Sequence, residues 1–226
     1  MKTLMVLLFL LWPLSVFAVD YPDLDKYYPL AEGNKWVYAF QIGFTKEDIV
    51  ERGVPENNFY IISSNGALGK FYYSVRKVGD RIVRVASQNV LTGEIQNDVN
   101  YKILVAPFKK GLKWFNSLEK GSSESYKFIG FVETSCKAGK FKDVAKFEYR
   151  IKSLKSKEMI EYQYFAPNVG LIKTEGKLPS KSIITIYELV DYKIKNGQVT
   201  KPKLDEKMQP TKDQTTEIDT TKVEQK

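Results

Sequence analysis

Two serine–lysine pairs are the first residues of this 226-residue chain that could supply a nucleophile. Each has the spacing Ser-x-x-Lys, Ser74 with Lys77 and Ser117 with Lys120, which on a helix places a hydroxyl beside an amine. Ser74 and Lys77 fall in a run that predicts a strand, where an offset of three puts the side chains on opposite faces. The second pair runs into a predicted turn. We therefore expect neither pair to be catalytic.

The chain has no histidine and a single cysteine, Cys136. These counts exclude Ser-His-Asp and Cys-His nucleophiles, the HExxH zinc site, an intramolecular disulfide and a Cys-rich zinc site. Cys136 precedes a turn predicted at 137–140, and we expect a small, partly buried residue. An intermolecular disulfide is the alternative. No cofactor and no metal site are expected.

Paired carboxylates are the remaining catalytic option, because a glycosidase needs only two acids. The candidate pairs are Glu94 with Asp98, Asp143 with Glu148, and Glu158 with Glu161. Only Glu94 and Asp98 share a strand face, and four residues of extended chain separate them by roughly 13 Å. That exceeds the spacing of either type of glycosidase, although pairs formed across strands stay open. The sequence therefore favours a protein that is not an enzyme.

The amino terminus has the pattern of a secretory signal peptide over residues 1–18. Lys2 supplies the positive start, Leu4–Trp12 the apolar centre, and Ala18 a small residue before the cleavage site. An uncleaved anchor is the alternative, but the apolar stretch lies at the lower limit for crossing a bilayer. No cysteine stands at the cleavage site, so lipidation is not expected. We predict a periplasmic or extracellular protein that is soluble after cleavage.

The composition predicts one folded domain over 19–200 and a disordered tail over 201–226. Hydrophobic residues make up 43% of the chain, which is enough for a core, whereas the tail has no aromatic residue and is rich in charge. The formal net charge of +8 comes mostly from lysine. Diffuse lysine charge on an exported protein predicts a solvated basic surface, with no nucleic-acid partner.

Apolar residues recur with a period of two through most of the domain. Phe147 and Tyr149 alternate with Lys146 and Glu148, which is the pattern of a strand with one face exposed to solvent. Turn signals such as Gly79-Asp80 separate the runs. Further runs lie near 58–63, 70–78, 81–88, 98–106, 113–118, 125–133, 158–166, 169–174 and 182–194. The sequence predicts an all-β antiparallel meander of ten or eleven strands, forming a curved half-barrel, a barrel or a sandwich.

One short helix is predicted over 46–52. Thr45 and Asp48 have the spacing of a capping box, and Gly53 followed by Pro55 is a typical helix stop. The helix would lie between the first two strands.

An internal similarity links 29–36 with 107–114. Both segments have Pro, an apolar residue, Gly, Lys and Trp at identical offsets, and the two copies lie 78 residues apart. The spacing is too long for a solenoid repeat. We interpret the two copies as the starts of two related halves near 28 and 106, with a chance match as the alternative.

Three motifs carry a family resemblance. They are Tyr28-Pro29-Leu30-x-x-Gly33-x-x-Trp36-x-Tyr38, Ala138-Gly139-Lys140-Phe141-x-x-Val144 and Tyr164-x-Ala166-Pro167-x-Val169-Gly170-Leu171-Ile172. The chain resembles a widespread group of uncharacterised bacterial exported β-proteins and lipoproteins over most of 27–175. Lys137 and Asn168 depart from that group, which often has proline and glycine there. The resemblance implies fold and location only. A likeness to half-barrel lipid carriers of the LolA type is a fold-level analogy.

Several predicted strands are apolar on both faces, which a single solvated sheet does not require. One interpretation is a curved sheet whose concave face binds an apolar or lipid-like ligand in the cell envelope. The alternative is a structural or protein-interaction module with a filled core and an envelope protein as its partner. The candidate lining residues are Trp36, Tyr38, Phe40, Phe71, Tyr73, Tyr126, Phe128, Tyr162 and Tyr164.

Overall fold

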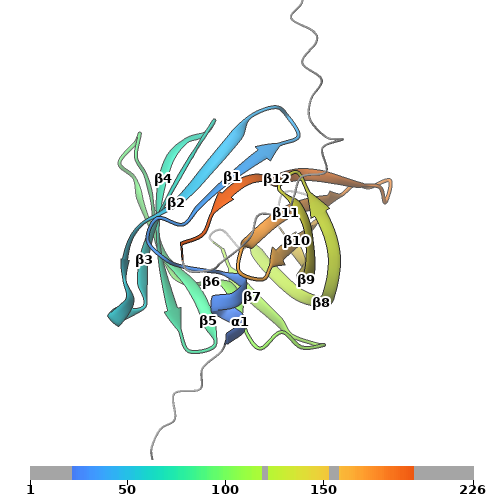
Figure 1. Cartoon of the computed structure of the whole chain (residues 1–226), viewed down its shortest axis with the longest axis horizontal. Helices are drawn as coiled ribbons and strands as arrows, with labels where there is room; N and C mark the ends of the chain where they lie inside the picture. The colour runs from blue at the N-terminus through green and yellow to red at the C-terminus, as the bar shows by residue number, and fades with distance from the viewer. Residues whose placement is uncertain (1–21, 119–121, 153–157, 196–226) are drawn as a thin grey trace, which may run out of the picture.

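The structure is a computed structural model that describes residues 22–118, 122–152 and 158–195 (Figure 1). The signal peptide predicted over 1–18 and the tail predicted over 201–226 lie outside the described residues. The described elements are α1 (Pro22–Tyr27), β1 (Lys35–Phe40), β2 (Thr45–Val54), η1 (Pro55–Asn57), β3 (Phe59–Gly66), β4 (Gly69–Val78), β5 (Arg81–Asn89), β6 (Ile95–Val105), β7 (Lys113–Ser117), β8 (Ser123–Cys136), β9 (Gly139–Lys152), β10 (Met159–Ala166), β11 (Gly170–Lys177) and β12 (Ile183–Lys193).

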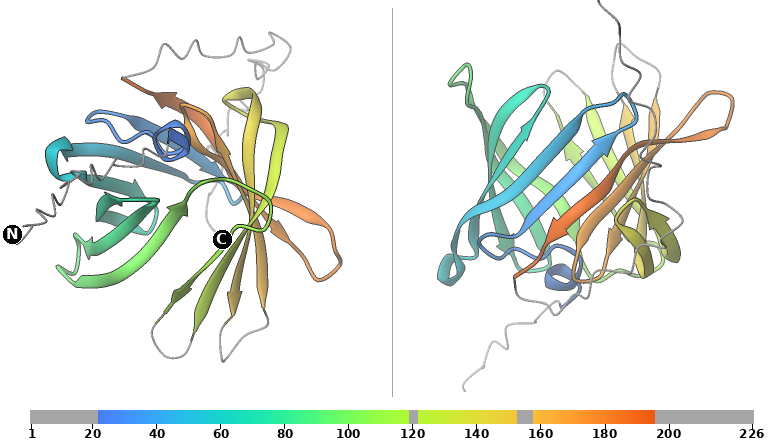
Figure 2. Two further views of the ribbon diagram at one scale, coloured as in Figure 1. Left: turned by 90° about the horizontal axis from the view of Figure 1, so that it is seen from below. Right: turned by 45° about the horizontal axis from the view of Figure 1, so that its top comes forward.

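All 12 described strands belong to one antiparallel sheet. Its order is β6-β5-β4-β3-β2-β1-β12-β11-β10-β9-β8-β7, so consecutive strands pair and the β1–β12 ladder joins the two ends of the meander. The sheet bends strongly, with β1–β6 on one side of the molecule and β7–β12 on the other (Figure 2). The predicted all-β meander is confirmed, as a curved sheet that is not closed by a backbone ladder.

Strands β6 and β7 are the two ends of the sheet, and a side chain connects them. Asn116 on β7 accepts a hydrogen bond from the Lys102 N–H (2.9 Å) and donates one to the Lys102 carbonyl (3.0 Å). The Trp114 indole donates to the same carbonyl at 3.3 Å. The buried Asn116 amide thus replaces the backbone pairing that the two strands lack, and we call this contact the seam.

The strand register separates an inner and an outer face. Cross-strand partners on the inner face run in one row, Phe40, Tyr187, Thr174, Gln163, Phe147 and Phe128. Phe147 is fully buried and packs edge-on against the rings of Phe108, Trp114 and Phe165. The inner face therefore carries the main core, because its aromatic side chains from both sides of the bend meet there.

Helix α1 closes one end of this core. Leu24 and Tyr27 are buried, and the Tyr27 hydroxyl donates to the Asp143 carbonyl at 2.6 Å. The ring of Tyr27 also packs against Phe108 and Phe131. The helix is short, and its two buried side chains fix its position.

The prediction of a helix over 46–52 is wrong, because this segment lies inside β2. Lys46 pairs with Tyr38 on one side and Gly66 on the other, so β1 and β3 both hydrogen-bond to the segment. Lys46 and Asp48 also form an ion pair at 2.9 Å, which the alternation of a strand allows. Pairing on both edges outweighs a capping motif that stabilises only the first turn of a helix.

Six strands precede residue 106 and six follow it. Trp36 is the second residue of β1 and Trp114 the second residue of β7, and both indoles donate to carbonyls, of Val169 and Lys102 respectively. A relationship between the two halves stays a prediction.

Neither of the helical segments in the described part of the chain is long and apolar enough to cross a membrane.

Candidate functional site

The nine predicted lining residues fall on two different faces of the sheet. Seven of them lie on the inner face, on β1, β4 and β8, namely Trp36, Tyr38, Phe40, Phe71, Tyr73, Tyr126 and Phe128. Tyr162 and Tyr164 lie on the outer face of β10, since they pair with Glu148 and Lys146 rather than with the Phe147 row. The structure therefore does not gather the nine residues around one space.

Side chains fill most of the inner face. Trp36 donates to the Val169 carbonyl at 2.5 Å, and Tyr38 donates to the Leu171 carbonyl at 3.0 Å. Beside them is a cavity of about 80 Å³, lined also by Tyr28, Asp48, Ile62 and neighbouring residues. This volume holds two or three water molecules at about 30 Å³ each. It has no room for an acyl chain.

An ion pair lies within this aromatic interior. Lys46 contacts Asp48 and lies over the rings of Tyr38 and Tyr187, at 5.2 and 5.9 Å from their centroids. Burial alone would lower the pKa of Lys46, but the Asp48 carboxylate reverses this and the pKa is raised. Burial, with a further effect of Asp48, raises the pKa of Tyr38 well above its ordinary value. The hydroxyl of Tyr38 thus stays protonated and serves as a donor.

A second group of charges lies on the inner face near the seam. Glu124 accepts hydrogen bonds of 2.6 Å from both Tyr101 and Tyr149. Burial, and then the nearby Glu124 carboxylate, raises the pKa of Glu161. Arg84 binds both carboxylate oxygens of Asp98, at 2.7 and 3.0 Å. These side chains hold one another in place and form a polar part of the core.

Three of the six acids that the sequence singled out as catalytic pairs form ion pairs with arginine. Asp98 is bound by Arg84, whereas Glu148 and Glu158 both contact Arg150, at 2.8 and 3.1 Å. Glu161 lies on the inner face, in the row of Tyr149. Within residues 22–118, 122–152 and 158–195, no cluster of three or more Cys, Asp or Glu could hold a metal ion.

The outer face of β8–β12 forms a tight curl. Bulges interrupt β8 next to Gly130 and again after Val132, and they bend the long β8–β9 hairpin over the sheet. The turn of the hairpin then meets β12, where Ala138 N–H donates to the Leu189 carbonyl at 2.9 Å and Lys137 N–H to the Glu188 carboxylate at 3.0 Å. We call this part of the molecule the curl.

Inside the curl, one acid is held by a lysine and a tyrosine. The carboxylate of Glu175 contacts the Lys173 ammonium at 2.8 Å and accepts the Tyr164 hydroxyl at 2.6 Å. Lys173 also donates to the Thr134 hydroxyl at 3.0 Å, which links β11 to the bent end of β8. Burial favours the neutral acid, yet Lys173 and Tyr164 together hold the pKa of Glu175 below its usual value. Glu175 is thus charged, and its carboxylate is bound by both Lys173 and Tyr164.

Lys146 lies next to this group and has a different environment. Its ammonium lies over two aromatic rings, 4.4 Å from the centroid of Tyr162 and 5.0 Å from that of Tyr164. Among the described residues it forms no ion pair, since Glu175 binds Lys173 and Glu148 binds Arg150, but its charge acts on Glu175 and helps to lower the pKa of that acid. The curl therefore contains a half-buried cation over two tyrosine faces.

A groove of about 690 Å³ lies beside the β8–β9 turn, at one end of the curl. Its walls are the β1–β2 turn, the start of β12 and the β8–β9 turn. The groove residues are Ala39, Phe40, Gln41, Gly43, Phe44, Thr45, Lys137, Ile183, Ile184, Thr185 and Glu188. Phe40 and Phe44 stack with centroids 4.7 Å apart, and Ile183 is 51% exposed. The groove thus combines an apolar wall with the Lys137–Glu188 ion pair.

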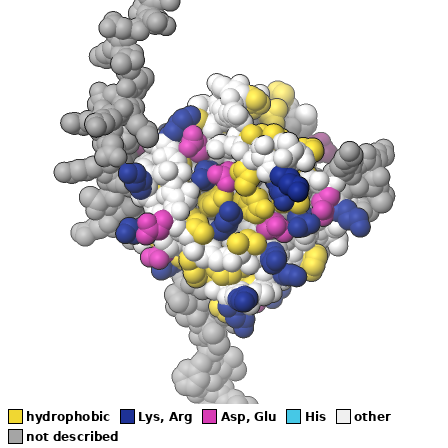
Figure 3. Space-filling model, turned by 90° about the vertical axis from the view of Figure 1, so that its right-hand side faces the viewer, with side chains coloured by type: hydrophobic (Ala, Val, Ile, Leu, Met, Phe, Trp, Pro, Cys, Tyr) yellow, Lys and Arg dark blue, Asp and Glu magenta, His cyan; other side chains and the backbone are white. Residues whose placement is uncertain are grey.

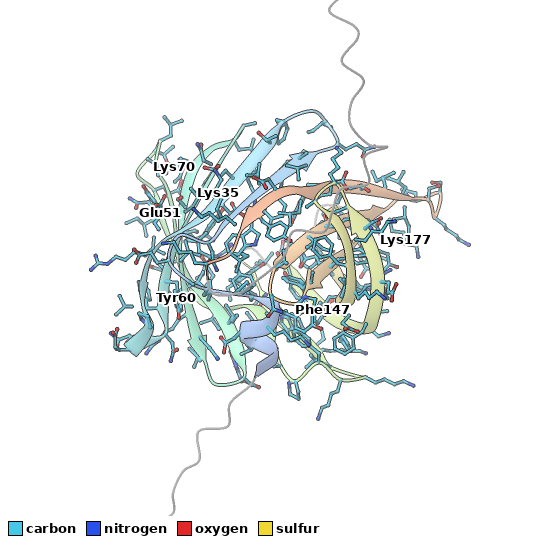
Figure 4. All side chains as sticks on the ribbon, viewed as in Figure 1. Lys35, Glu51, Tyr60, Lys70, Phe147 and Lys177 are labelled. Atoms are coloured by element: carbon cyan, nitrogen blue, oxygen red, sulfur yellow. The ribbon has the colours of Figure 1, made fainter. Side chains whose placement is uncertain are left out.

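The side of the molecule that lies at the right of Figure 1 has a mixed surface. Figure 3 shows hydrophobic side chains in its middle, with Lys, Arg, Asp and Glu side chains among and around them. In Figure 4, Phe147 lies within the packed side chains of the interior, whereas Lys177, at the end of β11, lies toward the outer edge. Charged side chains near solvent therefore lie on the outer face of the sheet, and the aromatic core lies on its inner face.

Sequence reasoning missed the lysines and glutamates of the curl. The alternation in β9 correctly separated Lys146 from Phe147, but it assigned Lys146 to a wet face. Gly130, with a φ of +152° at the first bulge, was the one local signal of a bend. Cys136, at the end of β8, is half-buried as expected, and burial raises the pKa of its thiol to about 11.

Comparison with known proteins gives distant similarities in structure. A "putative lipoprotein" from Parabacteroides distasonis ATCC 8503 is similar at 17% identity with a TM-score of 0.46, over 74% of this chain and 98% of that one. A "putative exported protein with YmcC-like fold" from Bacteroides fragilis NCTC 9343 is similar at 16% identity with a TM-score of 0.48, over 74% of this chain and 99% of that one. No family model matches the chain. No curated protein matches it either.

Proposed function

We propose that this protein is an exported, non-catalytic binding protein that holds an apolar or lipid-like ligand in the groove. The observation that carries the proposal is the size of the groove, which exceeds that of three other surface pockets, of about 490, 380 and 400 Å³, and of the interior cavity. The groove measures about 690 Å³ and the interior cavity about 80 Å³, and small-molecule sites are typically about 300–1,000 Å³. An apolar chain in the groove would contact Phe40, Phe44 and Ile183.

Export is supported by the amino-terminal pattern of residues 1–18, which is that of a signal peptide. A non-catalytic role is supported by the residue types of the chain, which lacks histidine, and by the arginine partners of Asp98, Glu148 and Glu158.

A structural or protein-interaction module is the second candidate. The filled interior favours it, because Trp36, Tyr38, Tyr126 and Phe128 are all buried core residues. In that case the groove would be a feature of the surface without a small-molecule ligand, and an envelope protein would be the partner.

Binding of a fluorescent apolar dye, N-phenyl-1-naphthylamine, separates the two candidates. We expect saturable binding that dodecanol displaces, and we expect Ile183→Ser to weaken it about tenfold because the variant removes an apolar wall of the groove. Val78→Ser is the matched control, since Val78 is similarly exposed (45%) and lies at the end of β4, away from the groove. Mass spectrometry of solvent extracts of the purified protein should also detect a bound lipid.

Absence of saturable dye binding together with lipid-free extracts would refute the binding function and favour the interaction module. Equal losses in Ile183→Ser and Val78→Ser would show that any dye binding is a general property of exposed apolar residues. Release of the chain at its full mass, with residues 1–18 still present, would refute export by signal cleavage.

A further inference from the structure

We propose that one end of the sheet, where the β1–β2, β3–β4, β5–β6 and β11–β12 turns lie, docks on the surface of a lipid bilayer that contains anionic lipid. We call it the tip end. Its turns, with their flanking residues, are the tip segments 41–45, 66–70, 89–95 and 177–183. The inference goes beyond the proposed function and does not require a ligand in the groove.

The topology brings the four turns to the same end. In an antiparallel meander every second turn lies at one end of the strands, and the β1–β12 ladder extends this rule across the whole sheet, since Lys35 at the start of β1 pairs with Lys193 at the end of β12. Neighbouring tips are two strands apart, roughly 10 Å. The right-hand view of Figure 2 shows the blue, teal and green turns along the upper edge of the sheet, with the orange β11–β12 turn beside them.

The tips expose large aliphatic side chains. Ile42, Leu68 and Leu91 are 78, 84 and 86% exposed. A glycine with positive φ follows each of them within two residues, and a Cβ at any of these three glycines would meet no atom within 4 Å, so the tips project into open space. Further exposed aliphatic residues of the tip segments are Val90, Ile95, Leu178 and Ile183. Single exposed aliphatic residues are common, but their concentration at one end indicates an interaction surface.

The opposite end of the same strands has a different composition. Its turns after β2, β4 and β10 consist of η1, Gly79-Asp80 and Pro167-Asn168. Among the described residues, Val78 (45%) is the one large exposed hydrophobic residue next to these three turns. The exposed aliphatic side chains are therefore a property of the tip end and not of hairpin turns in general.

The charge of the tip end favours an anionic lipid surface. The four tip segments contain three lysines, Lys70, Lys177 and Lys181, and one acid, Glu94. Figure 4 shows Lys70 and Lys177 at the periphery of the molecule. Lysines near an anionic bilayer are attracted to it, and apolar side chains flanked by lysines are the combination by which amphipathic segments bind the membrane interface.

The separation of the tips favours a bilayer over a folded protein partner. Side chains that project from separate turns would each need a matching pocket on a protein, whereas a fluid bilayer accepts them without shape complementarity. The groove lies at the same end, because Gln41, Gly43 and Ile183 line it. Docking would therefore bring the groove to the lipid surface.

Sedimentation with lipid vesicles tests the proposal. The probes are vesicles of phosphatidylcholine alone and of phosphatidylcholine with phosphatidylglycerol as the anionic lipid. We expect the exported protein to bind the anionic vesicles about tenfold more tightly than the neutral ones at about 0.15 M salt. The difference should disappear at about 1 M salt, where charges are screened beyond about 3 Å, and the apolar contribution should remain.

Variants assign the binding to the tips. Leu91→Ser should weaken binding to both kinds of vesicle about tenfold, because it removes an apolar contact with the bilayer. Val90→Ser and Val78→Ser are a matched pair, since the two valines are 44 and 45% exposed and flank β5 at its opposite ends. Val90→Ser should weaken binding about threefold, and Val78→Ser should leave it unchanged. Lys181→Gln should weaken binding to the anionic vesicles alone.

The results separate docking from its alternatives. Failure to bind either kind of vesicle, or equal effects of Val90→Ser and Val78→Ser, would overturn the proposal. Self-association that Leu91→Ser abolishes, measured by light scattering in the absence of vesicle binding, would assign the tips to a second copy of the chain and would also overturn it. Dye binding to the groove needs no vesicle, so the groove function can hold while docking fails.

Discussion

Asn116 provides the sharpest test of how the sheet holds its shape. The described strands β6 and β7 lack a backbone ladder, and the Asn116 side-chain amide hydrogen-bonds to both the backbone N–H and the backbone carbonyl of Lys102. Replacement of Asn116 by alanine removes both hydrogen bonds. The Lys102 carbonyl keeps the Trp114 indole as a donor, at 3.3 Å, whereas the Lys102 N–H loses its acceptor at the seam.

The cost follows from those two bonds. An unsatisfied N–H in a protein interior costs about 1–3 kcal/mol, and the lost bond to the already shared carbonyl adds about 1 kcal/mol. The free energy of unfolding should therefore fall by about 2–4 kcal/mol. For a domain of this size each kcal/mol lowers the melting temperature by about 2–4 °C, so the midpoint should fall by roughly 4–16 °C.

Urea unfolding followed by tryptophan fluorescence measures this change, and hydrogen exchange of the Lys102 amide reports on the seam itself. Asn97→Ala is the matched control, since Asn97 lies exposed on β6. A stability loss below about 0.5 kcal/mol in Asn116→Ala, or equal losses in the two variants, would refute the role of the seam.

Two further predictions concern the inner face. Phe147→Ala should lower the free energy of unfolding by about 3–5 kcal/mol, because the ring is fully buried among Phe108, Trp114 and Phe165; a loss below 1 kcal/mol in chemical denaturation would contradict this packing. Glu161→Gln should stabilise the protein increasingly as the pH rises above about 4.5. The reason is that burial and Glu124 raise the folded-state pKa of Glu161, so the wild-type protein loses stability between the unfolded and folded pKa values. Denaturation of both proteins from pH 4 to pH 8 measures the difference, and a constant difference across that range would contradict the assignment.

Much of the fold could be predicted from local sequence. The period of two in β9, the Gly79-Asp80 turn and the Trp36 segment are local signals, and the strands around them were correctly predicted. The error at 46–52 has a local origin as well. Thr45 and Asp48 have the spacing of a helix cap, but the pairing of β2 with β1 and β3 is a tertiary interaction that no local signal reports.

The candidate site could not be predicted for the same reason. The row of cross-strand partners on the outer face from Glu188 to Lys146 exists because four strands pair in one register, and its partial burial exists because bulges bend β8 over the sheet. The predicted lining set grouped Tyr162 and Tyr164 with the inner-face aromatic residues, whereas both lie on the outer face of β10. Sequence alternation could not distinguish a face open to solvent from a face covered by a distant hairpin.

A crystal structure of the protein with dodecanoate tests the central claim most directly. The account predicts the alkyl chain in the groove, in contact with Phe40, Phe44 and Ile183. An alkyl chain between the inner-face residues Tyr38 and Tyr73, or a groove without bound dodecanoate, would contradict it.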